Sequence, residues 1–435
     1  MATIHPFHAL RPSPADAARI AAVPYDVVSA EEARALAAGN PLSFLHVSRA
    51  EIDLPPATDP YAGQVYAQAA KAFDSLKSAL VVEDRPSLYF YRLRMGSHEQ
   101  TGLAGCYSID EYEGGLIKKH ERTRRDKEDD RTRHIVALRA QTGPVFLTYR
   151  ASAEVDAAAK RAAATEPLFD FEAADLVRHT IWRVAGGEVG DLVTAFARIP
   201  ALYIADGHHR AASAARARTE LKVAPKSLDP RWSLPGGADH ATFLGVAFPH
   251  DHVQILPYNR TVKDLAGLTP EAFLAEVRTR FAVREGPAAP ARRGEVGMYL
   301  GGRWQTLTLG GVQVGARDPR GSTGSPQASG GGASRAPSHD VIGTLDVSIL
   351  QEQLLAPLLK IADVRTDKRI DFVGGIRGTS ELERLVNGGK AAVAFSLYPV
   401  SVGDLMAIAD AGEIMPPKST WFEPKLRDGL LIHMT

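Results

Sequence analysis

A short polar segment, residues 206–210, combines residue types that could hold and process an anion. It reads Asp206-Gly207-His208-His209-Arg210, between an apolar stretch at 201–205 and an Ala-rich stretch at 210–222. This order predicts a strand, a loop and a helix that Asp206 caps, with Gly207 leaving the backbone open. The first turn of a helix attracts anions, and an arginine there can hold phosphate with two parallel hydrogen bonds. We therefore expect Gly207 and Arg210 to bind phosphate; the simpler interpretation is a capped helix with two hydrogen-bonded histidines.

The histidine pair within this segment leaves several roles open. His208 and His209 could act as hydrogen-bond donors, as a general base or as metal ligands. Neighbouring residues on a helix point to different faces, so one metal ion would need further ligands from elsewhere in the chain. The sequence does not assign the metal ligands.

A dense run of charge at residues 118–131 is the second candidate. Such a run usually forms the solvated face of a helix, but this one follows an apolar strand and interleaves both signs of charge. Phosphoryl transfer needs cations for the phosphate oxygens and carboxylates for Mg²⁺ or for a hydroxyl proton. The run offers both, in Lys119, His120, Glu121, Lys127 and Arg131. A mechanism that uses both segments assumes that residues 118–131 face residues 206–210. The sequence does not show this.

Three other regions carry weaker signals. Residues 415–425 place Lys418 and Lys425 around a Ser-Thr pair, and they either supply cations to a site or form a structural tail. The glycine-rich residues 374–378 lack the spacing of known nucleotide-binding loops. Asp26, beside an apolar run, is more often a structural residue.

Composition narrows the class of protein. Lys+Arg and Asp+Glu balance at 51 each, so no net field attracts nucleic acid or an anionic membrane surface. The single cysteine, Cys106, excludes an intramolecular disulfide and is typical of a reducing compartment. With no signal peptide and no long apolar run, we expect a cytoplasmic protein without a membrane span.

Alternating helix and strand patterns predict a mixed α/β fold with more than one lobe. We expect an N-terminal lobe at 1–150, a central lobe at 151–310, a flexible Gly/Ser/Pro-rich insertion at 311–339, and a C-terminal segment at 340–435 that packs back on the core. Residues 44–47 suggest a short strand, and residues 345–361 suggest one amphipathic helix.

Seven sequence motifs together resemble one known family. They are PYDVVS, NPLSFLHVSRAEIDLP, KKHERTRRDKEDDR, QTGPVFLTYR, YIADGHHRAASA, RIDFVGGIRG and MPPKSTWFEPKLRDGLLIH. In this order they resemble the bacterial and archaeal family called domain of unknown function 1015, from about residue 5 to residue 433. Residues 206–210 also look like the phosphate-gripping turn of the ParB/sulfiredoxin-like fold, which includes free serine kinases. The resemblance implies a phosphate-binding core of that fold.

Together these residues predict a small-molecule kinase with ATP, ADP or pyrophosphate as donor, and the resemblance implies that its acceptor is the hydroxyl of free L-serine. Gly207 and Arg210 would hold the donor, and His208 or His209 would stabilise the transferred group. Glu121 or Asp206 would orient or deprotonate the acceptor hydroxyl. His120 is a further catalytic candidate. The negative charge that develops on the phosphate would be neutralised by Lys119, Lys127 and Arg131. Mg²⁺ would bridge phosphate to carboxylate.

Two alternatives remain open. The same loop could bind a nucleotide in a non-catalytic regulatory protein, or the histidines could serve a phosphohydrolase that uses a metal ion. The sequence gives neither the phosphate donor nor the oligomeric state.

Overall fold

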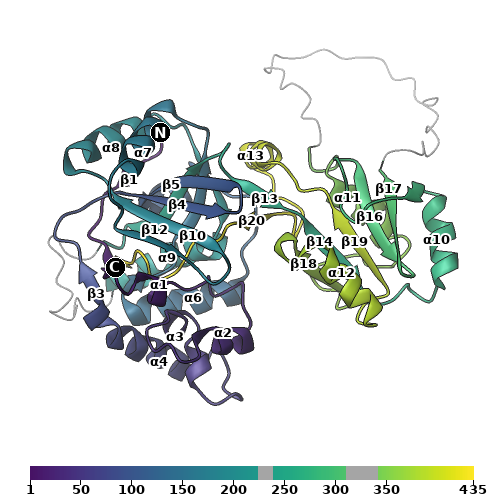
Figure 1. Cartoon of the computed structure of the whole chain (residues 1–435), viewed down its shortest axis with the longest axis horizontal. Helices are drawn as coiled ribbons and strands as arrows, with labels where there is room; N and C mark the ends of the chain where they lie inside the picture. Colours follow the sequence, from purple (N-terminus) through teal and green to yellow (C-terminus); the bar gives the residue numbers. More distant parts are fainter. Residues whose placement is uncertain (224–238, 310–340) are drawn as a thin grey trace, which may run out of the picture. The chain divides into compact units, whose positions relative to one another are not determined.

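The computed structural model describes residues 1–223, 239–309 and 341–435 (Figure 1). The insertion predicted at 311–339 lies outside these residues. The chain divides into two compact units: unit 1 comprises Met1–Gln254 and Phe422–Thr435, and unit 2 comprises Ile255–Trp421. The expectation of more than one lobe is confirmed. The lobe boundaries expected from the sequence follow chain order, whereas unit 1 joins the two ends of the chain.

A mixed sheet forms the centre of unit 1. Its strand order is β6-β11-β8-β12-β5-β4-β10-β9, with β1 paired to β5. Strand β11 runs parallel to β6, and β12 runs parallel to β8, while the other pairs are antiparallel. The strands are β1 (Ile4–His5), β4 (Tyr89–Met95), β5 (His98–Ser108), β6 (Ile117–Lys118), β8 (Val145–Tyr149), β9 (Phe169–Glu172), β10 (Val177–Arg183), β11 (Leu202–Asp206) and β12 (Thr242–Pro249). This mixture of parallel and antiparallel strands confirms the α/β class.

Two short strand pairs complete unit 1. Strand β2 (Leu10–Pro12) pairs with β3 (Leu80–Val82), and β7 (Ala140–Gln141) pairs with the C-terminal β21 (His433–Met434). The C-terminal residues therefore belong to the fold of unit 1.

The helices of unit 1 are α1 (Ala17–Ile20), α2 (Ala30–Ala37), α3 (Leu45–Ser48), α4 (Gly63–Ser75), α5 (Ile109–Glu113), α6 (Arg125–Leu138), α7 (Ala153–Ala163), α8 (Val189–Phe196) and α9 (His208–Val223), with 3-10 turns η1 (Ala50–Asp53), η2 (Lys77–Ala79) and η3 (Gly186–Glu188). Helices α2, α3, α4 and α6 lie together (Figure 1). The strand expected at 44–47 is wrong, because Leu45–Ser48 form helix α3 and Phe44 directly precedes it. Phe44 packs edge-on against Phe73 of α4, at 6.3 Å between ring centroids. Tertiary packing decides the conformation of an apolar run this short.

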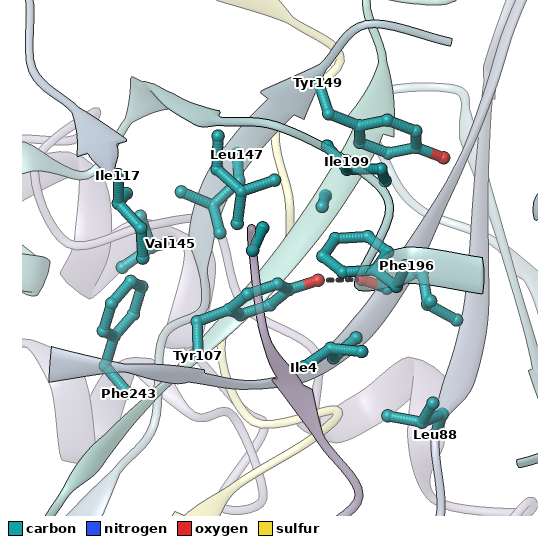
Figure 2. Packing of buried hydrophobic residues seen from close by; sticks show 14 of the residues in the cluster. Ile4, Leu88, Tyr107, Ile117, Val145, Leu147, Tyr149, Phe196, Ile199 and Phe243 are labelled. Atoms are coloured by element: carbon teal, nitrogen blue, oxygen red, sulfur yellow. Dashed lines mark hydrogen bonds between the residues drawn. The ribbon is translucent and has the colours of Figure 1, made fainter. Parts of the chain in front are cut away.

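A buried tyrosine marks the core of unit 1. Figure 2 shows Tyr107 of β5 among apolar residues of the sheet and of α8. Its ring lies 5.9 Å from that of Phe196, and its hydroxyl donates to the Leu103 carbonyl at 2.8 Å. The neighbouring Cys106 is also buried.

Unit 2 has its own sheet and its own core. The strand order is β15-β17-β16-β19-β14-β18. Its elements are β14 (Tyr258–Val262), α10 (Pro270–Arg278), β15 (Ala282–Glu285), β16 (Glu295–Leu300), β17 (Arg303–Thr308), α11 (Asp346–Leu350), η5 (Gln351–Leu355), β18 (Ile370–Gly374), η6 (Gly375–Arg377), α12 (Gly378–Asn387), β19 (Val393–Leu397) and α13 (Val402–Asp410). Strands β13 (Gln254–Leu256) and β20 (Trp421–Glu423) lie where the chain passes from one unit to the other.

The single helix expected at 345–361 is interrupted. After α11 the backbone widens into the π-helical segment η5, in which the N–H of Ala356 donates to the Gln351 carbonyl at 3.0 Å. Pro357 then follows, and proline has no N–H with which to continue the helix. The pattern of apolar residues does not reveal this change, because a single π turn within a helix alters that pattern very little.

Candidate active site

The loop predicted at 206–210 joins the end of β11 to the start of α9. Gly207 lies between them with φ +97°, a backbone conformation that a side chain disfavours. The N–H of Ala211 donates to the Gly207 carbonyl at 3.0 Å, so the helix begins immediately after Gly207. The expectation that Asp206 caps α9 is therefore wrong. Asp206 instead accepts hydrogen bonds from two cationic side chains.

Arg210 lies against Gly207 and does not extend into solvent. Its side chain is 10% exposed, and its guanidinium donates to the Pro144 carbonyl and to Asp206 Oδ1, the latter at 3.4 Å. A Cβ at Gly207 would stand 3.0 Å from Arg210 Nε, so the glycine leaves room for the guanidinium. Buried Nε makes no hydrogen bond. Arg210 thus binds protein groups while one of its N–H donors lacks a partner.

Lys425, from the C-terminal part of unit 1, is the second cation on Asp206. Its Nζ lies 2.7 Å from Asp206 Oδ2, and the two side chains are largely buried. Burial alone would raise the pKa of Asp206, but the charges of Lys425 and Arg210 hold that pKa well below its usual range. Asp206 is therefore ionised at neutral pH and a weak base. Of the two lysines noted in residues 415–425, Lys425 reaches the loop, whereas Lys418 lies in unit 2 over the ring of Tyr258.

The charged segment 118–131 faces the loop, which the sequence left undecided. The backbone N–H of His120 donates to His208 Nε2 at 3.4 Å, and the N–H of Arg124 donates to His209 Nε2 at 3.0 Å. Glu121 Oε2 lies 3.7 Å from His208 Nδ1. Helices α6 and α9 also pack together along their length. Two motifs far apart in the sequence therefore form one group.

The three histidines of this group are neutral at physiological pH. Burial lowers the pKa of His120 to about 4 and lowers those of His208 and His209 as well. Because Nε2 of His208 and of His209 accepts a backbone N–H, we assign the proton to Nδ1 in both rings. The rings of His120 and His208 meet edge to face, at 4.4 Å between centroids.

Two of the predicted cations contact aromatic side chains. Lys119 Nζ lies 3.8 Å from the centre of the Tyr112 ring. Lys127 Nζ donates to the Tyr61 hydroxyl at 2.9 Å. Neither of these contacts involves residues 206–210.

Arg131, the third predicted cation, lies in the interior of unit 1. It pairs with Asp130 at 2.9 Å, and its guanidinium stands 4.1 Å from the centre of the Tyr25 ring. Tyr25 and Asp428 interact electrostatically with both Arg131 and Arg210. Arg131 therefore shares partners with Arg210.

Sequence reasoning missed one buried carboxyl and undervalued another acidic residue. Asp428 is buried beside Gly143, and burial raises its pKa to about 7, although Arg210 opposes the shift. Exposed Asp26 acts electrostatically on Asp428, His209 and Arg210. Asp26 and Asp428 both lie in motifs that carry the family resemblance, and that position in the motifs was the sequence feature that could have identified them.

Cavities lie in unit 2, and their chemistry differs from that of the residues gathered around the start of α9. One of about 590 Å³ is bordered by Lys263, Asp371, Arg377, Glu381 and Lys390, together with apolar residues. It contains no histidine. The convergence of histidines, carboxylates and cations in unit 1 is the stronger indicator of a catalytic site.

Among the helices of the described residues, none combines the length and the apolar character that a membrane span requires.

Comparison with known proteins gives a family and distant structural relatives. A family model described as protein of unknown function (DUF1015) matches residues 4–348. No curated protein matches the chain.

Three solved structures illustrate the structural likeness. A conserved hypothetical protein from Pyrococcus furiosus is 12% identical, with a TM-score of 0.34 over 76% of this chain and 95% of its own. SbnI with a C-terminal truncation, from Staphylococcus aureus, is 12% identical, with a TM-score of 0.38 over 76% and 87%. A free serine kinase in complex with AMP is 11% identical, with a TM-score of 0.34 over 74% and 91%. At such values the function must be argued from this chain's own residues.

Proposed function

Because the chain belongs to the DUF1015 family of proteins of unknown function, as its motifs indicated, we propose its activity from the site in unit 1: it is a small-molecule phosphotransferase. Specifically, it transfers a phosphoryl group from ATP, ADP or pyrophosphate to the hydroxyl of free L-serine. The observation that carries this proposal is the meeting of residues 118–131, the 206–210 loop and Lys425 at the start of α9. The choice of serine rests on the resemblance of the loop to the ParB/sulfiredoxin-like turn.

The positive groups at this position suit a phosphate donor. Transferring a phosphoryl group requires fixed positive charge around oxygens that gain charge in the transition state. Arg210 and Lys425 are held in place by Asp206, and the first turn of α9 adds backbone dipoles. In this proposal Asp206 positions the two cations and Gly207 keeps the guanidinium close to the backbone.

The acceptor hydroxyl needs a base, and Glu121 fits this role better than Asp206. A serine hydroxyl is a poor nucleophile until its proton is removed or shared. The low pKa of Asp206 makes it a weak proton acceptor. Glu121 is 54% exposed and lies beside His208, so a substrate can reach it. Asp428, with its pKa near 7, is a second group whose protonation changes close to neutral pH.

Mg²⁺ would neutralise the donor phosphates. It prefers carboxylate oxygens and retains several waters. Asp26 is an exposed carboxylate residue beside the group and would hold the ion together with water. Burial and two cationic partners disfavour Asp206 as its ligand.

The test is direct detection of phosphoserine. Purified protein is incubated with Mg²⁺, L-serine and each donor in turn, and the products are followed by ³¹P NMR. We expect phosphoserine with one of the donors, and Glu121→Gln should lower kcat by about 10²-fold or more. Glu154→Gln, which alters a surface ion pair with Arg198, should leave the rate unchanged. Absence of phosphoserine with all three donors would contradict the proposal.

A metal-dependent phosphohydrolase is the second candidate, because His120, Glu121 and His208 form a group able to hold a metal ion. In the same assay a hydrolase would release inorganic phosphate whether or not serine is present. Tight nucleotide binding without any product would instead favour the regulatory alternative.

A further inference from the structure

We propose that His120, Glu121 and His208 form a binding site for a divalent transition-metal ion, with Zn²⁺, Fe²⁺ or Mn²⁺ as the class of occupant. Each residue offers one ligand atom, and these atoms lie within 4.8 Å of one another. The site does not depend on the donor or acceptor proposed above, but it uses Glu121, which does not act as a free base while it holds the ion.

His120 supplies the observation that points to a ligand. Its side chain is 1% exposed, yet neither Nδ1 nor Nε2 makes a well-aligned hydrogen bond within the described structure, although the Ile204 backbone lies close enough to interact with the ring. A buried polar group without a hydrogen-bond partner destabilises the folded state. A cation bound to one ring nitrogen would satisfy it, and the other nitrogen could turn to a backbone acceptor, as is usual behind metal-bound imidazoles.

The orientation of His208 agrees with this assignment. Its Nδ1, which carries the ring proton before an ion binds, faces Glu121, while Nε2 accepts the His120 backbone N–H at 3.4 Å. Coordination of an ion through Nδ1 would move that proton to Nε2 and replace this long hydrogen bond. The 3.7 Å between His208 Nδ1 and Glu121 Oε2 is close to the separation of about 3.3 Å expected for two ligands of a tetrahedral ion with bonds of about 2.0 Å. The ligand atom of His120 lies within 4.8 Å of the other two. It therefore needs to move toward them by only on the order of 1 Å, which a small rotation of its side chain provides.

The donor set selects the kind of metal ion. Two imidazoles and one carboxylate suit Zn²⁺, Fe²⁺ and Mn²⁺, whereas Mg²⁺ and Ca²⁺ prefer oxygen ligands alone. Three protein ligands also leave a coordination position open for water or a substrate oxygen, as catalytic zinc sites do. Glu121 is the exposed member of the group, so the ion would enter from its side.

Zinc binding to the whole chain tests the proposal. The protein, free of any affinity tag, is stripped with chelator and titrated with Zn²⁺ by calorimetry; cobalt absorption and zinc-edge X-ray absorption then report the ligands. We expect one ion per chain, bound by two imidazoles and an oxygen ligand. Glu121→Gln should weaken zinc binding by at least about tenfold. Even the loss of a residue that only hydrogen-bonds to a metal ligand lowers metal affinity by about 10- to 100-fold. His208→Gln should weaken it further.

His209→Gln is the matched control, because His209 neighbours His208 in the chain but its Nε2 accepts from Arg124. This variant should keep the zinc affinity of the parent. Glu121 is exposed, so its variant should fold normally, and circular dichroism checks this. No stoichiometric binding, or equal affinity in the parent and in folded E121Q and H208Q, would overturn the proposal.

Discussion

At the residue scale, the central feature is that the Asp206 carboxylate accepts hydrogen bonds from both Arg210 and Lys425. The sequence correctly marked residues 206–210 as polar residues at a strand–helix junction. It predicted that Arg210 would bind phosphate, whereas in the structure its side chain is buried between Asp206 and the Pro144 carbonyl. Local sequence could not show this, since Pro144 and Lys425 belong to distant segments that only the fold brings to the loop.

Replacing Gly207 with alanine should destabilise unit 1 by about 2 kcal/mol or more, because φ is +97° and the new Cβ would meet the Arg210 guanidinium at 3.0 Å. Urea unfolding measures the change. Gly96→Ala is the control: Gly96 also has positive φ, but a Cβ there meets nothing within 4 Å, so only the backbone cost of about 1 kcal/mol applies. Equal costs at the two glycines would mean that the guanidinium is not held against Gly207.

The raised pKa of Asp428 predicts a defined pH dependence. Burial raises this pKa from 3.8 to about 7, so the folded state binds a proton that the unfolded chain releases. The resulting stabilisation is complete below about pH 4 and disappears as the pH rises through 7, a difference of about 4 kcal/mol. Asp428→Asn imitates the protonated form at every pH. The variant should therefore gain stability relative to the parent between pH 5 and pH 8, as measured by urea unfolding. A difference that does not change with pH would contradict the burial argument.

At the element scale, the packing of α9 on α6 holds the two charged motifs together. Helix α9 and strand β11 were predicted from the sequence. Long segments with clear periodicity and caps were predictable because local interactions determine them. The short run at 44–47 was not, because packing against α4 decides its conformation.

Ser213 tests this helix contact. It is fully buried, and its hydroxyl donates to the Glu128 carbonyl of α6 at 3.2 Å. Ser213→Ala removes one hydrogen bond and should cost about 1 kcal/mol. Ser213→Leu must also push the helices apart, which should cost a further 1–3 kcal/mol or so. Chemical denaturation of both variants compares these costs. A leucine variant as stable as the alanine variant would show that the helices do not meet closely at this point.

At the scale of the whole molecule, unit 1 depends on residues from both ends of the chain. The C-terminal segment supplies Lys425 and Asp428 to the site and pairs β21 with β7. The sequence resemblance covered this segment, but nothing local showed that it returns to the N-terminal unit across the whole of unit 2.

Ending the chain at Trp421 should therefore unfold unit 1 and spare unit 2. The deletion removes the buried apolar residues Leu430, Leu431, Ile432 and Met434. Each stabilises the fold by about 2 kcal/mol, so the total loss of about 8 kcal/mol approaches the stability of a typical domain. Hydrogen exchange followed by mass spectrometry should show rapid exchange throughout residues 1–254 and protection in the sheet of unit 2. Protection retained in both units would contradict this division.

The claim that the start of α9 is a phosphate-processing site is tested most directly by the imidazole signals of its histidines. Full-length protein labelled with ¹⁵N-histidine is titrated with Mg·ADP and with magnesium pyrophosphate, and the resonances are assigned with His120→Gln, His208→Gln and His209→Gln. We predict that at least one of these ligands shifts the signals of His208 and His209 in a saturable manner while that of His46, on helix α3, stays constant. If both ligands saturate the protein without moving any signal of His120, His208 or His209, the phosphate site lies elsewhere and the account is wrong.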